Sequence, residues 1–577
     1  MNYSSEKNVL LMIGLLKAHN IRKVITSPGT TNITFVGSIM HDSFFQIYSS
    51  VDERSAAYMA CGMAEECGEP VVLSCTGATA SRNYFPGLTE AYYRKLPILA
   101  ITSTREECKI GHLIDQQIDR TQQPKDTVVF STHLQLIKDG EDWWDCSIKI
   151  NKAILALWDK GGGPVHINMP TTYSNDFGVS ELPKVTRISR YYTHNDIPEI
   201  NKREVSIFIG THKLMTEREE EAIDKFCEIY NAIVFGDSCC GYHGKYLIKL
   251  NAVGRKRNMD LLIHIGEVSC VAYSCVPREV WRVNEDGELR DTFRKLTTVF
   301  SMPEYVFFEK CTAGKSGKNI TRYEQCLLKE KTYYNNILDV PFSNRWVASY
   351  LYNKLPKDCV VHLGIVSSFL AWNQFKLDNS IRINCNQGGF GIDGNISSLL
   401  GASLINPKKI YYCFIGDLAF FYDMNALGNR HIGNNIRILL VNNGKGVLFR
   451  KPWNLGSIFG DEADLYISAG AHFGNQNPEL VKNFAINLGF DYITASTKKA
   501  FIQEYEKFVD PEIHDKPMLF EIFVSTEDEI EGDKNIRPTE GIKGKLFSLL
   551  GEDVYDYCKN MLKPTVKGKM HIDIHRK

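Results

Sequence analysis

Continuous runs of apolar residues, separated by stretches of helical periodicity, constrain the fold of this chain more than any other feature. Residues 70–75, 97–102 and 410–415 are three such runs. A strand that is apolar throughout is covered on both faces, as the strands of parallel sheets are. Residues 55–67, just before the first run, carry small or apolar side chains at the i, i+3, i+4 and i+7 positions of a helix. This alternation predicts doubly wound α/β domains built on parallel sheets.

The pattern recurs three times along the 577 residues, so we expect three doubly wound parallel-sheet domains. Their expected bounds are 1–180 for the first, 190–335 for a central one and 340–530 for the third, with a tail at 531–577. The expected strands are residues 23–26, 45–51, 70–75, 97–102, 205–209, 232–235, 261–265, 359–363, 381–385, 410–415, 437–441 and 518–524. Residues 173–204 and 310–344 lack the pattern and are expected to be irregular, whereas residues 422–431 are expected to be helical.

Charge and cysteine usage limit the class of protein. Lys and Arg number 67 against 68 Asp and Glu, so the net charge of −1 gives no field that favours nucleic acid or an anionic membrane. Residues 1–25 mix apolar with charged side chains and match neither a secretory signal nor a membrane span. The sixteen cysteines are scattered without a C-x-x-C pair, which is typical of a reduced cytoplasmic protein.

Two short polar motifs follow neighbouring expected strands of the third domain. Gly416-Asp417 comes directly after residues 410–415, and Asn442-Asn443 comes directly after residues 437–441. If these strands are parallel neighbours, Asp417 and Asn443 emerge at one edge of the sheet, where ligands of α/β proteins bind. A carboxylate and an amide oxygen suit a hard cation such as Mg²⁺, which also takes phosphate and carbonyl oxygens. From the residues alone, ordinary strand-end turns explain both motifs as well.

The spacing, Gly-Asp followed 26 residues later by the second of two asparagines, resembles the diphosphate motif of thiamine-diphosphate-dependent enzymes. The resemblance implies thiamine diphosphate and Mg²⁺ as cofactors. It implies that Asp417, Asn443 and the backbone carbonyl of Lys445 hold the magnesium ion. It also places Gly416, Leu418 and Val447 against the cofactor.

A carboxylate at a second strand-to-helix junction fits the same family. Glu53 lies in Val51-Asp52-Glu53-Arg54-Ser55-Ala56-Ala57, where the helix dipole alone would also favour an acidic residue. In thiamine-diphosphate enzymes a Glu at such a junction bonds N1′ of the cofactor's pyrimidine, so that the cofactor deprotonates its own C2; this makes Glu53 the implied catalytic residue. The resemblance further implies that Thr76 and Gly77 contact the cofactor and that Ile392 bends it.

Further motifs in chain order narrow the resemblance. They are Ser27-Pro28-Gly29, Cys75-Thr76-Gly77, Asn83-Tyr84-Phe85-Pro86, residues 102–105, residues 116–119, Gly391-Ile392-Asp393-Gly394 and Tyr422-Asp423-Met424-Asn425-Ala426-Leu427. They are similar to motifs of the 2-succinyl-5-enolpyruvyl-6-hydroxy-3-cyclohexene-1-carboxylate synthase family of menaquinone synthesis. By this likeness the three domains are pyrimidine-binding, central and diphosphate-binding. The likeness also implies a homodimer or homotetramer whose active site, at the subunit interface, combines Glu53 of one subunit with Asp417 of another.

The substrate-binding arginines of that family are missing from this chain. Thr30 and Thr31 follow the Ser-Pro-Gly turn where the family has Ser-Arg, Gln387 replaces an Arg after Asn386, and residues 364–370 lack a third Arg. Thr, Gln and Leu do not replace a bidentate Arg–carboxylate contact, so we expect substrates other than isochorismate and 2-oxoglutarate. The residues expected at the substrate are Thr30, Thr31, Arg82, Arg105, His112, Gln116, Gln387 and Arg450.

We therefore expect a transferase or lyase that decarboxylates a 2-oxo acid and transfers the acyl carbanion to a carbonyl or related acceptor, forming a C–C bond. A plain decarboxylase that releases an aldehyde is the alternative outcome. A different class, an NAD(P)-binding oxidoreductase, is indicated by Gly389-Phe390-Gly391-Ile392-Asp393-Gly394, a G-x-G-x-x-G motif between an expected strand and a helix. That class leaves Glu53 and Asn443 without a role. A binding protein on an inactivated scaffold is disfavoured because Glu53, Asp417 and Asn443 are all retained.

Overall fold

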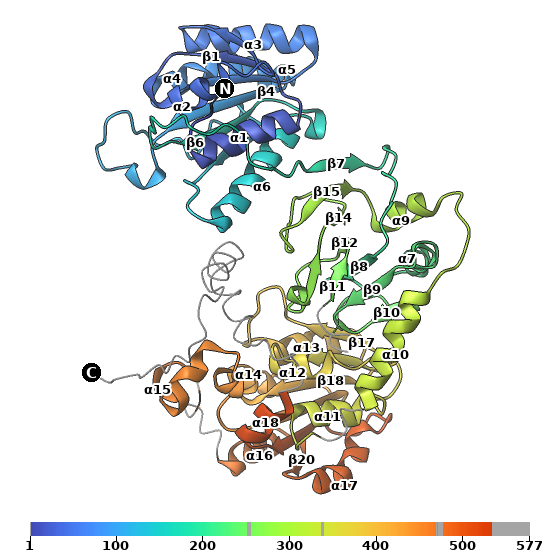
Figure 1. Ribbon diagram of the computed structural model, residues 1–577. Coiled ribbons are helices and arrows are strands. Elements are labelled where there is room, and N and C mark those ends of the chain that lie inside the picture. Colours follow the sequence, from blue (N-terminus) through green and yellow to red (C-terminus); the bar gives the residue numbers. More distant parts are fainter. Residues whose placement is uncertain (1, 251–255, 336–339, 469, 471–476, 534–577) are drawn as a thin grey trace, which may run out of the picture. The chain divides into compact units, whose positions relative to one another are not determined.

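A computed structural model of the protein describes residues 2–250, 256–335, 340–468, 470 and 477–533 (Figure 1). The chain forms two compact units that divide between Arg190 and Tyr191. The first unit is built on one sheet, and the second on two large sheets and a two-stranded one.

The first unit is a six-stranded sheet with helices on both faces. Its strands, in the order β2-β1-β3-β4-β6-β5, are β1 (Lys23–Thr26), β2 (Gln46–Ser49), β3 (Val71–Thr76), β4 (Ile98–Thr104), β5 (Phe130–His133) and β6 (Val165–Pro170), and all of their pairings are parallel. Its α-helices are α1 (Lys7–Ala18), α2 (Ile33–Ile39), α3 (Glu53–Cys67), α4 (Thr79–Asn83), α5 (Phe85–Arg94) and α6 (Gly140–Ala156). Leu99 and Ile101 of β4 lie in one core with α1, α2 and α6, whereas Ile98 and Ala100 lie in another with α3 and α5. The apolar run of β4 therefore fills two cores at once.

The central sheet of the second unit has the order β10-β9-β8-β12-β14-β15-β7. Its strands are β7 (Ser189–Tyr192), β8 (Val205–Ile209), β9 (Ile233–Gly236), β10 (Leu247–Ile248), β12 (Leu261–Ile265), β14 (Val280–Asn284) and β15 (Leu296–Ser301). Its helices are α7 (Glu217–Tyr230), α9 (Glu304–Thr312) and α10 (Thr321–Asn335), and β11 (Lys256–Met259) pairs with β13 (Cys275–Pro277). A capping box of Thr216 and Glu219 starts α7, whose Phe226 packs edge to face on Phe308 of α9.

The third sheet has the order β17-β16-β18-β19-β21-β20, all parallel. Its strands are β16 (Val360–Leu363), β17 (Arg382–Cys385), β18 (Tyr411–Gly416), β19 (Ile436–Asn442), β20 (Asp491–Ala495) and β21 (Met518–Phe523). Its α-helices are α11 (Asn344–Leu351), α12 (Ser367–Trp372), α13 (Asn395–Ser403), α14 (Asp417–Asp423), α15 (Ala463–Tyr466), α16 (Pro478–Asn487), α17 (Lys498–Val509) and α18 (Thr526–Asp533). Gly416 is opposite Val441 across the β18–β19 pair. The polar motifs that follow these two strands therefore share one sheet edge.

The predicted fold class is confirmed, and three local predictions are wrong. Residues 310–344 include the helix α10, and residues 173–204 include the strand β7. The helix expected at 422–431 instead begins earlier, at Asp417, and is followed by a 3-10 turn over Met424–Gly428. The domain bounds stay predictions, and residues 534–577 of the expected tail lie outside the described residues.

No helix within the described ranges is both long and apolar enough to cross a membrane. The cysteines of the described structure are free thiols, and most of them are buried. They occupy small apolar positions, as Cys61 of α3 does in the core between α3 and β3.

Candidate active site

Asp417 lies at the carboxyl end of β18, as the first residue of α14. Its side chain is 2% exposed and accepts hydrogen bonds from the backbone N–H groups of Leu418 (2.8 Å), Asn443 (3.3 Å) and Gly446 (3.4 Å). Burial raises the pKa of Asp417, and the backbone donors oppose that rise. Its partners in the described structure are backbone groups, with no lysine or arginine among them. A bound cation would compensate this buried carboxylate.

The two asparagines after β19 have different environments. Asn442 is buried; its Nδ2 donates to Glu521 Oε1 at 2.8 Å, and its Oδ1 accepts from the backbone N–H of Gly444 at 3.0 Å. Asn443 is half-buried beside Asp417, and its Oδ1 accepts a 3.2 Å hydrogen bond from the backbone N–H of Lys445. The second asparagine is thus the one next to the carboxylate.

The donor set at this edge fits a hard divalent cation. The Asp417 carboxylate, the Asn443 amide oxygen and the Lys445 carbonyl are oxygen ligands of the kind that Mg²⁺ accepts together with phosphate oxygens. Among the described residues there is no cluster of three or more His, Cys, Asp or Glu that could hold a metal. An ion at Asp417 would therefore depend on amide, carbonyl and diphosphate oxygens. Gly446 has φ +61° and lies against Leu418, and Val447 behind it is buried.

Glu53 is the first residue of α3 in the first unit. The side chain of Asp52 caps the helix by accepting from the backbone N–H groups of Arg54 (2.9 Å) and Ser55 (3.3 Å). The Glu53 carboxylate is half-buried and accepts a 3.2 Å hydrogen bond from Nδ2 of Asn83 in α4. Its position is therefore fixed from two directions, by the helix start and by Asn83.

Two turns meet at the carboxyl edge of the first sheet. A Cβ on Gly29 would collide with the side chain of Thr76, and a Cβ on Gly77 would lie 3.1 Å from Nη2 of Arg120. Ala78, the next residue, has φ +55°, a strained conformation for a residue other than glycine. Strain of this kind is concentrated at functional sites.

Ile392 lies in the loop after β17, two residues after Phe390, which has φ +58°. Its side chain is half-buried against the core under the third sheet, and its carbonyl accepts a 3.0 Å hydrogen bond from Nδ2 of Asn395. The loop therefore presents an apolar side chain on a fixed backbone.

The predicted substrate residues of the first unit differ in their protein hydrogen-bond partners and in their exposure. Arg105 forms two 3.0 Å hydrogen bonds with the Asp115 carboxylate and a third, of 2.8 Å, with the Tyr173 hydroxyl. Arg82 donates from Nη2 to the Asp119 carbonyl at 3.1 Å. Thr31 is buried and donates to the carbonyl of Ser103, whereas Thr30, His112 and Gln116 are exposed.

The remaining two predicted substrate residues have strong protein partners. Gln387 is 1% exposed; its Nε2 donates to Asp237 Oδ2 and Thr211 Oγ1, both at 3.1 Å, and its Oε1 accepts from the backbone N–H of Cys270 at 3.0 Å. Arg450 pairs with Asp461 and Asp464, each at 2.6 Å. Both side chains are engaged within the second unit.

The alternative dinucleotide motif lacks the strand arrangement it needs. The fingerprint requires the glycine loop and the acidic residue to follow adjacent strands. Here the loop Gly389–Gly394 follows β17 and Asp417 follows β18, but β16 lies between these two strands. The topology does not favour an oxidoreductase.

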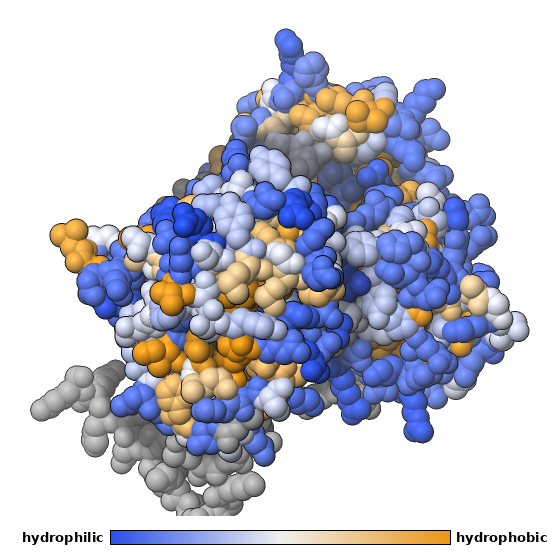
Figure 2. Space-filling model, turned by 90° about the horizontal axis from the view of Figure 1, so that it is seen from above, coloured by the Kyte–Doolittle hydropathy of each residue, from blue (hydrophilic) through white to orange (hydrophobic). Residues whose placement is uncertain are grey.

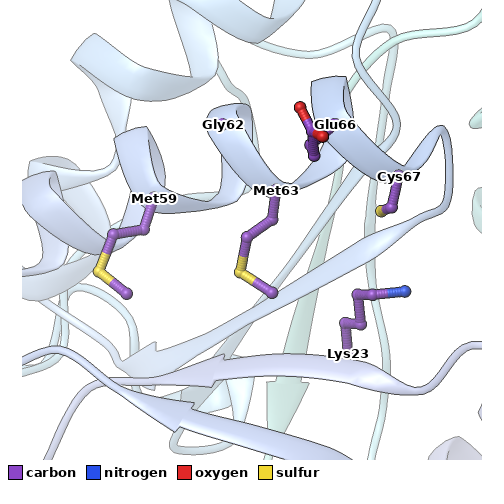
Figure 3. A pocket seen from close by; sticks show the side chains of 6 residues that line it. All are labelled: Lys23, Met59, Gly62, Met63, Glu66 and Cys67. Carbon is purple, nitrogen blue, oxygen red and sulfur yellow. The ribbon is translucent and has the colours of Figure 1, made fainter.

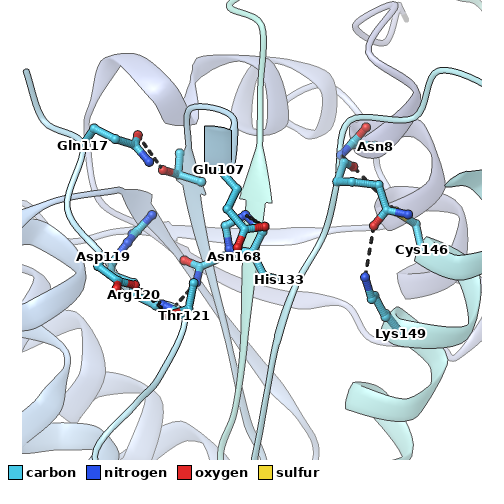
Figure 4. Close-up of polar contacts among 12 residues, drawn as sticks. Asn8, Glu107, Gln117, Asp119, Arg120, Thr121, His133, Cys146, Lys149 and Asn168 are labelled. Carbon is cyan, nitrogen blue, oxygen red and sulfur yellow. Dashed lines mark hydrogen bonds and ion pairs between the residues drawn. The ribbon is translucent and has the colours of Figure 1, made fainter. Parts of the chain in front are cut away.

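Arg120 is a residue of this site that the sequence reasoning missed. It directly follows Asp119 of the motif at 116–119 (Figure 4), is 4% exposed and lies against Gly77. An arginine in an irregular segment is ordinarily solvated, so its burial has no signal in the sequence. Its adjacency to a motif residue, Asp119, is the only hint.

Comparisons with known proteins show what this chain is similar to. The family model described as "Thiamine pyrophosphate enzyme, N-terminal TPP binding domain" matches residues 9–123, which include Glu53, Thr76 and Gly77. The 2-succinyl-5-enolpyruvyl-6-hydroxy-3-cyclohexene-1-carboxylate synthase of Bacteroides thetaiotaomicron is 31% identical over 547 residues, covering 90% of this chain and 96% of that protein. The synthase of the same name from Phocaeicola vulgatus is 30% identical over 553 residues, covering 91% and 97%.

A match of this length and identity spans the first unit and both large sheets of the second. The chain belongs to the family of thiamine-pyrophosphate enzymes that includes the 2-succinyl-5-enolpyruvyl-6-hydroxy-3-cyclohexene-1-carboxylate synthases.

Proposed function

We propose that this chain is a thiamine-diphosphate- and Mg²⁺-dependent enzyme that decarboxylates a 2-oxo acid and joins the remaining acyl carbon to a carbonyl acceptor. The observation that carries the proposal is the buried Asp417 carboxylate, held by backbone N–H groups of Asn443 and Gly446 where β18 and β19 end. The synthase names of the relatives support the C–C bond over plain release of an aldehyde.

In this proposal the second unit holds the charged end of the cofactor. Asp417, Asn443 and the Lys445 carbonyl bind Mg²⁺, and Gly416, Leu418 and Val447 line the cofactor beside it. Ile392 supports the middle of the cofactor from the loop after β17. When bound, thiamine diphosphate supplies the carbanion that attacks the keto carbon.

Glu53 of the first unit has the proton-transfer role. Its carboxylate shares a proton with N1′ of the pyrimidine, and the hydrogen bond from Asn83 keeps the carboxylate in place for that exchange. Thr76 and Gly77, at the end of β3, lie on the same sheet edge and form the wall beside it.

We further propose that Glu53 of one subunit and Asp417 of another complete each site in a homodimer or homotetramer. The outer face of α3, just past Glu53, carries Tyr58 and Met59, which are 48% and 41% exposed. A shallow cavity of about 440 Å³ along this helix is lined by Lys23, Met59, Gly62, Met63, Glu66 and Cys67 (Figure 3). Hydrophobic side chains gather in patches on the face seen from above in Figure 2. The exposed apolar side chains on the outer face of α3 support a subunit contact there.

The proposed partners are small molecules, a 2-oxo acid and a carbonyl acceptor, and the proposed location is the cytoplasm. Free thiols that include the exposed Cys67 and Cys108 support a reducing compartment. A net charge of −1 gives no support for a nucleic-acid partner.

The test is a panel of 2-oxo acids incubated with the full chain, Mg²⁺ and thiamine diphosphate, with release of CO₂ as the readout. We expect CO₂ release with at least one acid. This release should be lost when EDTA is added or thiamine diphosphate is left out. Adding aldehydes and ketones then separates the two outcomes, since a ligated product supports the carboligase and a free aldehyde supports the plain decarboxylase. If none of the 2-oxo acids in the panel releases CO₂, the proposal is overturned.

A further inference from the structure

Arg120 is a buried guanidinium that has no partner of opposite charge in the part of the chain that the structure describes. Its side chain is 4% exposed, and Nε and Nη1 have no hydrogen-bond partner among the described residues. Burial lowers the pKa of Arg120 to about 10, and the nearby Arg82 adds to the decrease. An uncompensated buried charge is costly, so its retention calls for an anion.

The backbone around Arg120 is held firmly in place. Nδ2 of Asn168, on β6, donates to the Arg120 carbonyl at 2.9 Å (Figure 4). Oγ1 of Thr102, on β4, donates to Asn168 Oδ1 at 2.8 Å. Nε2 of Gln123 donates to the Arg120 carbonyl at 3.1 Å. Side chains of β4 and β6 therefore hold the backbone from which the Arg120 side chain extends.

The guanidinium lies at the corner that the proposed function uses. Its Cζ and Nη1 are 3.3 Å from where a Cβ on Gly77 would be, so any larger residue at position 77 would crowd the guanidinium. Cys75, one residue before Thr76, feels the charges of both Arg120 and Glu53, and burial keeps that thiol neutral by raising its pKa to about 12. The thiol thus cannot be the missing anion.

Two other cations of this corner are already engaged. Arg105 is paired with Asp115, and Arg82 donates to the Asp119 carbonyl. His133, which faces Arg120, has its pKa lowered by burial and by Arg120, so it is neutral at physiological pH. Among the described residues of this corner, Arg120 is the cation whose Nε and Nη1 are buried without a hydrogen-bond partner.

We propose that the Arg120 guanidinium binds a carboxylate of the substrate, and that this carboxylate is one that the reaction retains. The inference rests on the proposed function. A fixed cation at the carboxylate that leaves as CO₂ would stabilise the ground state more than the transition state and slow the reaction. A retained carboxylate keeps its charge throughout the reaction, so binding it stabilises the ground state and the transition state alike and does not slow decarboxylation. It belongs either to the far end of the donor acid or to the acceptor.

The segment that carries Arg120 allows a ligand to enter. Residues 107–118, which precede the anchored Asp119 and Arg120, contain a single 3-10 turn at Glu107–Lys109 and no other regular element, and their backbone–backbone hydrogen bonds, such as those of Ile110 and Gln117, are local. Opening this part of the segment breaks few long-range backbone contacts and leaves the Arg120 carbonyl bonded to Asn168.

The first arm of the test measures binding without turnover. Glutarate is titrated into the cofactor-loaded protein by calorimetry, with uncharged glutaramide as its isostere, in the natural chain, in Arg120→Met and in the exposed ion-pair control Arg94→Met. We expect glutarate but not glutaramide to bind, with affinity about 10- to 100-fold weaker in Arg120→Met and unchanged in Arg94→Met. Equal glutarate affinity in Arg120→Met, or none in the natural chain, would overturn the proposal.

Thermal unfolding without glutarate gives a readout that separates binding from structure. Arg120→Met removes an unpaired buried charge, so we expect a higher Tm; a lower Tm would assign Arg120 a structural role instead. A change of oligomeric state in Arg120→Met with unchanged glutarate binding would mean that a partner subunit supplies the anion, which also overturns the proposal.

The second arm uses turnover and locates the carboxylate. For matched donors such as 2-oxohexanoate and 2-oxoadipate, we expect Arg120→Met to lower kcat/KM about 100-fold only for substrates with a retained carboxylate, and Arg120→Lys to recover part of it. If the carboxylate is on the acceptor, ligation falls while CO₂ release does not. If no 2-oxo acid is turned over, the proposed function fails, and the glutarate arm still decides the role of Arg120.

Discussion

The Asn442 side chain donates a 2.8 Å hydrogen bond from Nδ2 to the carboxylate of Glu521, which is itself fully buried in β21. Burial raises the pKa of Glu521, and the donors Asn442 and Tyr492 oppose that rise. The first asparagine of the pair is therefore part of the sheet interior, and only the second, Asn443, is left beside Asp417.

This division predicts opposite effects for the two asparagines. Asn443→Ala removes a proposed metal ligand, so we expect Mg²⁺-dependent binding of thiamine diphosphate to weaken at least 10-fold with an unchanged Tm. Asn442→Ala removes the donor to Oε1 of the buried Glu521 carboxylate and leaves only Tyr492 bonded to it, so we expect a loss of about 1–3 kcal/mol of stability. Cofactor titration and urea unfolding of both variants test this, and equal effects on binding would contradict it.

Gln387 predicts a stability effect away from the metal site. Gln387→Leu keeps the shape of the side chain but removes the donors to Asp237 and Thr211 and the acceptor for the Cys270 N–H. Because burial already raises the pKa of Asp237, losing a donor to it costs about 1–3 kcal/mol. We expect a lower Tm by differential scanning calorimetry. An unchanged Tm would show that these contacts carry no stability.

His166 predicts a loss of stability in acid. It is fully buried between the hydroxyls of Thr102 and Ser131, and burial lowers its pKa from 6.5 to about 3. The folded state binds this proton less readily, so the stabilisation is complete above pH 6.5 and is lost as the pH falls. Urea unfolding at pH 7.5 and pH 5 should show a loss about 2 kcal/mol larger in the natural chain than in His166→Gln.

The control for this pH effect is His41→Gln, which changes an exposed imidazole of the same unit. It should keep the pH dependence of the natural chain. A His166→Gln variant with the same pH dependence as the control would contradict the assignment.

The apolar face of α3 predicts the effect of a surface charge on assembly. Met59→Glu places a carboxylate on the proposed subunit contact, so we expect the natural oligomer to dissociate at micromolar concentration in analytical ultracentrifugation. Trp158→Glu alters another exposed apolar side chain, 52% exposed, and should leave the assembly intact. An oligomer that persists in Met59→Glu would place the contact elsewhere.

Strands of this fold could be predicted from the sequence because parallel strands are buried on both faces and read as unbroken apolar runs. The bounds of β8 and β12 are those predicted. Helix α10 was missed because its buried stripe includes Glu330, which accepts a hydrogen bond from the backbone N–H of Lys249. A polar residue on the inner face hides the periodicity of a helix.

The candidate site was predictable only where short motifs follow strands. Asp417 and Asn443 could be placed at one edge because adjacent parallel strands end together. The partners of Gln387 could not be predicted, since Asp237 is 150 residues away in the chain. The burial of Arg120 was equally hidden, because it depends on how the irregular segment 105–126 folds over Gly77.

The most direct test of the account is the exchange of the C2 proton of bound thiamine diphosphate for deuterium, measured by NMR in the natural chain and in Glu53→Gln. The substitution keeps the shape of the side chain and its acceptor for Asn83 but cannot share a proton with N1′. We expect exchange to slow at least 100-fold in Glu53→Gln while the Kd for the cofactor changes less than about 10-fold. Exchange at the natural rate in Glu53→Gln would contradict it.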